Sequence, residues 1–154
     1  MSQAEVLADL QSKIGSEIHV SDWHVVDQAQ INNFADATGD HQWIHVDPER
    51  AAKESPYGAT IAHGYLTLSL YPMLREIVKP EPPFPGVINV INYGLNKLRF
   101  TNAVRSGAKV RSKAVIAAVD EVKGGLQVTE TVTIEIDGEE RPACLAEAIM
   151  RYYF

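Results

Sequence analysis

The fold is decided by residues 64–78, which read GYLTLSLYPMLREIV. Apolar side chains occupy nearly every face of this segment, a pattern typical of a buried helix rather than a surface helix. Pro72 has no N–H to donate, so it is expected to kink the helix or to remove one internal hydrogen bond. The apolar members are Tyr65, Leu66, Leu68, Leu70, Met73, Leu74 and Ile77.

The half of the chain that follows this helix is predicted to consist of strands. Four segments are rich in β-branched and aromatic residues, and glycine-containing turns at 106–107, 124–125 and 137–138 separate them. A buried helix before four antiparallel strands predicts an α+β fold, in which a curved antiparallel sheet wraps around a long central helix. The four strand segments are 87–100, 108–119, 125–136 and 141–153.

The chain before residue 64 is predicted to contain one strand and two helices. Residues 16–26 indicate a short strand, and the helix over 28–38 has Asp27 as its N-cap. Gly39 ends that helix, because glycine readily adopts the left-handed conformation of a helix C-terminus. Too little chain lies on either side of the proline-rich connector at 79–86 to form two domains. Residues 1–154 are therefore expected to form a single domain.

Asp40 and His45 lie between this helix and the next, which is predicted near 48–53 with Asp47 as its N-cap. On one unbroken helix their side chains would point about 140° apart. Because Gly39 ends the first helix, both side chains instead share a compact loop and can converge on one water molecule. A carboxylate and an imidazole are suited to moving a proton. The alternative is that Asp40 caps a turn and His45 is an ordinary surface histidine.

The string ATGDHQWIHVDP at 37–48, followed by Ala62-His63-Gly64, resembles the MaoC-like, R-specific enoyl-CoA hydratase family. That family's motif runs Gly-Asp-x-Asn-Pro-x-His, and a His-Gly pair begins the central helix. Gly39, Asp40 and His45 match the motif, whereas Gln42-Trp43 replaces the Asn-Pro pair, as in NodN-like members. The resemblance implies the hotdog fold and R-specific hydration of trans-2-enoyl-CoA, or the reverse dehydration of (R)-3-hydroxyacyl-CoA.

The resemblance also assigns roles to individual residues. Asp40 corresponds to the principal base and His45 to the proton donor that binds the water, although a coupled pair shares its protons and the order stays open. Gly64 is expected to offer its backbone N–H to the thioester oxygen, since a helix N-terminus presents unpaired donors. His63 is expected to fix the turn into the helix. Asn92 and Gly94 lie on a strand where substrate can bind, but strand packing explains them equally well.

Net charge and hydropathy limit the classes of molecule that the protein is expected to bind. The net charge of −6 excludes the broadly basic surface that nucleic acids require, while a phosphate-bearing acyl-CoA needs only a local basic patch. No apolar run approaches the roughly 20 residues of a membrane span. Cys144 is the only cysteine, which fits a reducing cytoplasm. Candidates for the basic patch are Lys97, Arg99, Arg105, Lys109, Arg111 and Lys113, which a solvated sheet face explains as well.

A metal site is not expected, and neither is a cofactor beyond the coenzyme A thioester that serves as substrate. His41 and His45 stand four residues apart and could ligate an ion with His63, but Gly39 and Pro48 leave no room for a helix that turns both toward it. A single sheet with open edges predicts a homodimer. Two alternative functions stay open on the same fold, a thioesterase and a non-catalytic acyl-CoA-binding module. The residues leave open the acyl chain length and the choice between coenzyme A and a carrier protein.

Overall fold

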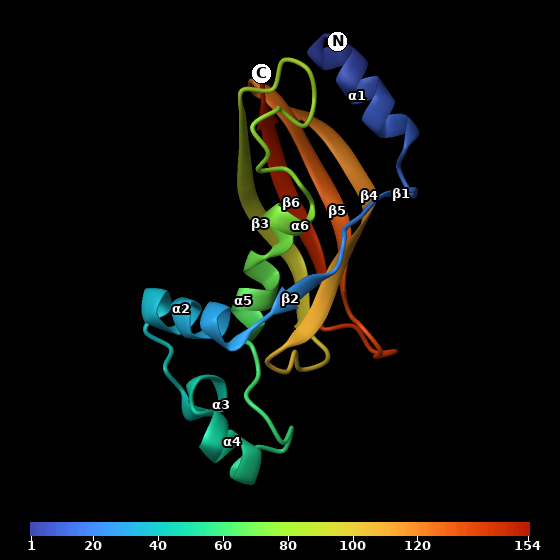
Figure 1. Cartoon of the computed structure of the whole chain (residues 1–154). Helices are drawn as coiled ribbons and strands as arrows, with labels where there is room; N and C mark the ends of the chain where they lie inside the picture. The colour runs from blue at the N-terminus through green and yellow to red at the C-terminus, as the bar shows by residue number, and fades with distance from the viewer.

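A computed structural model describes residues 1–154. Its framework is one antiparallel sheet, in which the strands lie in the order β1-β4-β5-β6-β3 and β2 also pairs with β4 (Figure 1). All four predicted strand segments are confirmed, but 16–26 forms two short strands where the sequence predicted one. The strands are β1 Glu17–Val20, β2 His24–Val26, β3 Asn89–Phe100, β4 Ala108–Val122, β5 Gly125–Ile136 and β6 Cys144–Tyr153.

The central helix lies against one face of this sheet and is broken into α5, Gly64–Ser69, and α6, Tyr71–Leu74 (Figure 1). Pro72 explains the break, because it cannot donate to the carbonyl one turn earlier. Bonds from Leu70 to Leu66 and from Leu74 to Leu70 continue the helical path on either side of it. The single long helix of the prediction is therefore two short helices, and the predicted disturbance at Pro72 is confirmed.

The helix is buried on one face only, which corrects the prediction that it is buried all round. Leu66, Leu70 and Leu74 pack into the core, whereas Tyr65 is 68% exposed and Met73 is 43% exposed. The core lies between the buried helix face and the inner face of the sheet, where alternate side chains of β4, β5 and β6 point inward. Apolar burial of this kind supplies most of the driving force for folding.

Strand β3 forms one edge of the sheet and hydrogen-bonds to β6 only. Its pairing is irregular, with register shifts between Asn92 and Gly94 and between Leu95 and Lys97. Most of its residues are exposed, including several large apolar ones. These apolar side chains are Ile91, Tyr93, Leu95 and Phe100.

A buried ionic cluster ties the helix to the sheet. Glu130 on β5 is only 1% exposed, and its carboxylate accepts hydrogen bonds from the Tyr71 hydroxyl and from the guanidinium of Arg75 at 3.2 Å (Nε) and 3.1 Å (Nη2). Burial next to this carboxylate raises the pKa of Tyr71 above its ordinary value, so the hydroxyl remains a donor. The cluster fixes the end of α6 against the middle of the sheet.

Helix α1, Gln3–Ser12, was not predicted. Its N-terminus carries a capping box, in which the Ser2 hydroxyl accepts from the Glu5 N–H and the Glu5 carboxylate accepts from the Ser2 N–H. Val6 and Leu10, one helical turn apart, are buried against β4 and β5. No helix in the structure is both long enough and apolar enough to cross a membrane.

Candidate active site

The segment before the site folds as the sequence predicts. Helix α2 spans Gln28–Thr38, and the Asp27 carboxylate accepts from the Gln30 N–H at 2.8 Å. Gly39 ends the helix with φ = 82°, a conformation that disfavours side chains. Asp40 therefore leaves the helix axis and is exposed at the start of a short loop.

His45 lies on a helical turn that the sequence did not predict, α3, Trp43–Val46. Helix α4, Pro48–Glu54, follows as predicted, with the Asp47 carboxylate accepting from the Arg50 N–H at 3.0 Å. The short α3 turn is stabilised from outside itself, because the amide of Gln28 donates to the His45 carbonyl at 2.7 Å. The Thr60 hydroxyl in turn donates to the Gln28 side-chain oxygen at 2.5 Å, which fixes that amide.

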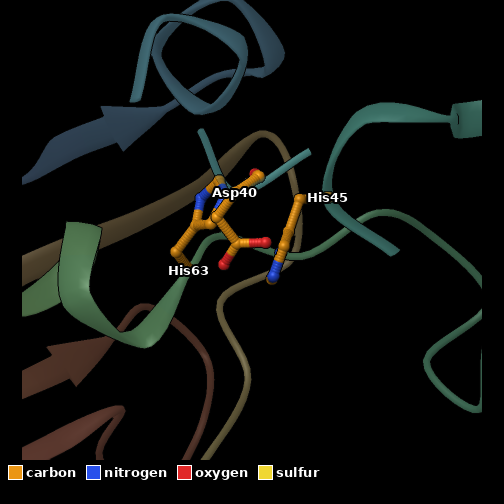
Figure 2. Close-up of side chains that lie close together, drawn as sticks. All are labelled: Asp40, His45 and His63. Atoms are coloured by element: carbon orange, nitrogen blue, oxygen red, sulfur yellow. Dashed lines mark hydrogen bonds between the residues drawn. The ribbon is translucent and has the colours of Figure 1, made fainter. Parts of the chain in front are cut away.

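Asp40 and His45 come together as predicted, and His63 joins them (Figure 2). One carboxylate oxygen and one nitrogen from each ring all lie within 4.8 Å of one another. Figure 2 shows the Asp40 carboxylate turned toward the ring of His45, with His63 beside it. The three side chains come from the loop after α2, from α3 and from the residue that precedes α5.

His45 is held as a neutral imidazole with one free nitrogen. It is 8% exposed, and its Nδ1 lies 2.7 Å from the Ile61 carbonyl, which can only accept, so Nδ1 carries the proton. Burial lowers the pKa of His45 below its ordinary value, and the neighbouring His63 acts in the same direction. At neutral pH the free Nε2 is therefore a proton acceptor.

His63 is 3% exposed and contacts both other members of the site. Its Nε2 donates to the backbone carbonyl of Asp40 at 2.9 Å, and its ring stacks on the His45 ring with 3.8 Å between centroids and 25° between planes. The Phe34 ring, from α2, lies 4.9 Å away. The remaining nitrogen, Nδ1 of His63, is buried without a hydrogen-bond partner.

The geometry of these rings does not favour a shared metal ion. An imidazole binds a metal in its own ring plane at about 2.0–2.1 Å. The rings of His45 and His63 stack nearly parallel, so their lone pairs do not converge on one point at that distance. His41 is not part of this cluster and pairs with Asp36 at 2.8 Å, a hydrogen bond that raises the pKa of His41. The expectation of no metal stays a prediction.

Gly64 begins α5 with its backbone N–H outside the helical hydrogen bonds. The first helical donor is the N–H of Thr67, which donates to the His63 carbonyl at 3.1 Å. A Cβ atom on Gly64 would lie 2.7 Å from the ring of Phe100, so the position has no room for a side chain unless that ring moves. Gly64 and Phe100 line one cavity of about 370 Å³, together with Tyr57 and Arg141.

Asn92 and Gly94 lie on β3 and line a different cavity, of about 350 Å³. Leu68 and Tyr71 of the central helix form the opposite wall of that cavity. Neither Asp40 nor His45 lines it within one chain. The part that Asn92 and Gly94 play in substrate binding stays a prediction.

The supporting residues of the site were missed by sequence reasoning. Gln28, Thr60 and the Ile61 carbonyl hold α3 and His45 through hydrogen bonds that span 16 to 32 residues of chain. No pattern among neighbouring residues in the sequence predicts contacts between residues so far apart. Only the position of His63 directly before Gly64 gave a signal, and it indicated the turn rather than the contact with Asp40.

Comparisons with known proteins identify the family of the chain. The family model described as "MaoC like domain" matches residues 9–138. The 3-hydroxyacyl-thioester dehydratase Z of Mycobacterium tuberculosis is 47% identical over 153 residues, which cover 99% of each chain. Nodulation protein N of Rhizobium leguminosarum is 47% identical over 145 residues, 93% of this chain and 88% of that protein.

A solved structure shows the same fold. The (R)-hydratase from A. caviae involved in PHA biosynthesis superposes with a TM-score of 0.65 at 26% identity, over 86% of this chain and 96% of that one. The predicted hotdog fold is confirmed by this likeness and by the sheet that packs on α5 and α6. The expectations of a NodN-like subgroup and of a hydratase or dehydratase are confirmed by the two close relatives. The chain therefore belongs to the MaoC-like dehydratase family, and it is an enzyme of the lyase class.

Proposed function

We propose that the protein hydrates trans-2-enoyl-CoA to (R)-3-hydroxyacyl-CoA, or catalyses the reverse dehydration, with Asp40 and His45 as the acid–base pair. One observation carries the proposal, namely the Asp40 carboxylate placed within 4.8 Å of the ring nitrogens of two buried histidines. Similarity to a dehydratase of 3-hydroxyacyl thioesters and to an (R)-hydratase supports the substrate class and the stereochemistry.

The pair is suited to holding one water molecule. The Asp40 carboxylate and the free Nε2 of a neutral His45 are both acceptors, so a water between them donates one hydrogen to each and keeps an oxygen lone pair for C3 of the enoyl chain. As the C3–O bond forms, the pair takes one proton from the water. The double-bond electrons move to the thioester oxygen, where the Gly64 N–H stabilises the enolate. The pair then delivers the proton to C2 on the same face, which gives syn addition.

Substitution of the pair tests this assignment. Asp40→Asn and His45→Gln should each lower the rate of enoyl-CoA hydration by at least about a hundredfold, because a positioned acid–base group contributes about 10²–10⁴. His41→Gln is the matched control, since His41 lies in the same segment but pairs with Asp36 outside the site. The measurements are loss of the conjugated double bond and the configuration of the product.

The proposal fails if either substituted protein keeps most of its activity or if the product has the S configuration. Release of free coenzyme A, followed in the same reactions, would indicate a thioesterase. Binding of the enoyl thioester with no turnover in the parent protein would indicate a non-catalytic module.

We also propose that the working form is a homodimer. The edge strand β3 and the exposed face of the helix carry exposed apolar side chains that a second copy can cover, among them Tyr65, Met73 and Tyr93. Light scattering should give twice the mass of the chain at micromolar concentration. A fully active monomer would contradict the proposal.

The proposed reaction uses no metal and no cofactor besides the thioester, and it takes place in the cytoplasm. Prolonged treatment with a chelator should therefore leave the hydration rate within about twofold of the untreated rate, since acid–base groups alone supply the proton transfers. A lasting loss that returns on adding one divalent metal would overturn this part of the proposal.

A further inference from the structure

His63 carries an unexplained polar atom in the interior. The residue is 3% exposed, yet its Nδ1 has no hydrogen-bond partner. A buried polar atom without a partner costs about 1–3 kcal/mol. An apolar ring would pack beside Phe34 and His45 without that cost. The imidazole is therefore expected to do something that packing alone does not require.

The other nitrogen of the ring shows what that is. Nε2 of His63 lies 2.9 Å from the backbone carbonyl of Asp40, which can only accept, so Nε2 carries the proton and Nδ1 is bare. Asp40 follows the left-handed Gly39 and is itself exposed, so few contacts limit its motion. The only other hydrogen bond to it is a long one, 3.3 Å from the Gln42 N–H to its carboxylate. His63 is thus the main support of the Asp40 backbone.

The same ring also supports the second member of the pair. It stacks on His45 at 3.8 Å between centroids, while the Ile61 carbonyl holds Nδ1 of His45 at 2.7 Å. Both members of the pair therefore rest on Ile61 and His63.

We propose that His63 is a positioning residue, whose Nε2–H holds the main chain of Asp40, so that one water fits between the Asp40 carboxylate and the His45 imidazole. The proposal rests on the proposed function, because the fit of that water is what it explains. In this role the His63 ring lies behind the reacting atoms and does not contact the substrate.

Two substitutions separate the donor from the ring. His63→Gln keeps an N–H donor at about the position of Nε2, whereas His63→Phe keeps an aromatic ring and loses the donor. We expect His63→Phe to lower kcat at least tenfold with KM changed less than about threefold, since small misplacements of catalytic groups cost up to about 100-fold. His63→Gln should restore most of that loss in kcat.

Phe34→Leu is the matched control, because Phe34 contacts the His63 ring but makes no hydrogen bond to Asp40. It should lower thermal stability and leave kcat within about threefold of the parent value. A His63→Phe protein with the parent kcat would overturn the proposal, and so would equal losses of kcat in His63→Phe and His63→Gln. If Phe34→Leu lowers kcat as much as His63→Phe does, His63 acts only through packing, and the proposal is also overturned.

A measurement on the unaltered protein stands apart from activity and from the folding of any variant. Nitrogen-15 NMR of the histidine rings should show a proton on Nε2 of the neutral His63 ring and none on its Nδ1. The opposite tautomer, with the proton on Nδ1 and none on Nε2, would overturn the proposal even if hydration is observed. Absence of hydration together with the expected His63 spectrum would instead count against the proposed function and leave the support of Asp40 standing.

Discussion

Replacing Glu130 with glutamine should destabilise the protein severely, although the two side chains have nearly the same shape. The carboxylate accepts one hydrogen bond from Tyr71 and two from Arg75 in the interior of the protein. In Glu130→Gln one oxygen becomes an NH₂ donor that faces another donor, and the guanidinium loses its counter-charge. Removing one partner of a buried ion pair costs about 3–5 kcal/mol. The Arg75 side chain is 13% exposed and can reach some water, so the lower end, about 3 kcal/mol, is expected.

Urea denaturation at a fixed protein concentration measures this cost. With a slope of about 2 kcal/mol per M, a loss of about 3 kcal/mol lowers the midpoint by about 1.5 M. The triple change Glu130→Met, Arg75→Met and Tyr71→Phe is the control, because it removes every polar partner together and should stay within about 1 kcal/mol of the parent. A shift of less than about 0.3 M for Glu130→Gln would refute the reasoning, since it would mean that the buried guanidinium does not need its partner.

Three other predictions follow from individual residues. Gly64→Ala should lower kcat for hydration at least tenfold and destabilise the protein, because the new Cβ would lie 2.7 Å from the Phe100 ring. Adding Phe100→Ala removes that ring and should restore stability but not turnover, if the thioester needs the space at Gly64. Because the folded state lowers the pKa of His45, protonation favours the unfolded chain, so the melting temperature should fall as the pH drops below about 6.5, and less steeply in His45→Gln. Burial raises the pKa of Cys144 to about 11, so iodoacetamide at pH 8 should modify it only at the rate of unfolding, and rapid modification of the native protein would contradict its burial.

The parts of the fold that could be predicted from the sequence are those determined by a few neighbouring residues. Gly39 ends α2 and Asp47 caps α4 because the residue types themselves prefer these conformations, and the alternation in β5 reflects a sheet with one buried face. The break beside Pro72 follows from a missing N–H. Each of these needs only a few neighbouring residues.

The parts that it missed depend on contacts between distant segments. The α3 turn exists because Gln28 and Ile61 bind it from elsewhere in the chain, and its four residues carry no cap of their own. The exposure of Tyr65 could not be predicted either, since an apolar side chain looks the same whether its own chain or a second copy covers it. In the site, the pair Asp40–His45 was predicted, but the support from His63 depends on a hydrogen bond between residues 23 apart.

The strand order has a consequence for how the protein is made. Strand β6 is the last element of the chain, yet it lies inside the sheet between β5 and β3. During synthesis, β3 and the helices that carry the site leave the ribosome long before β6, and β3 has no other strand to pair with until β6 arrives. The sheet therefore closes only after β6 has been made, and a chain truncated before Cys144 would lose two strands rather than one. Termination before Cys144 should therefore yield aggregating protein rather than a slightly weakened enzyme.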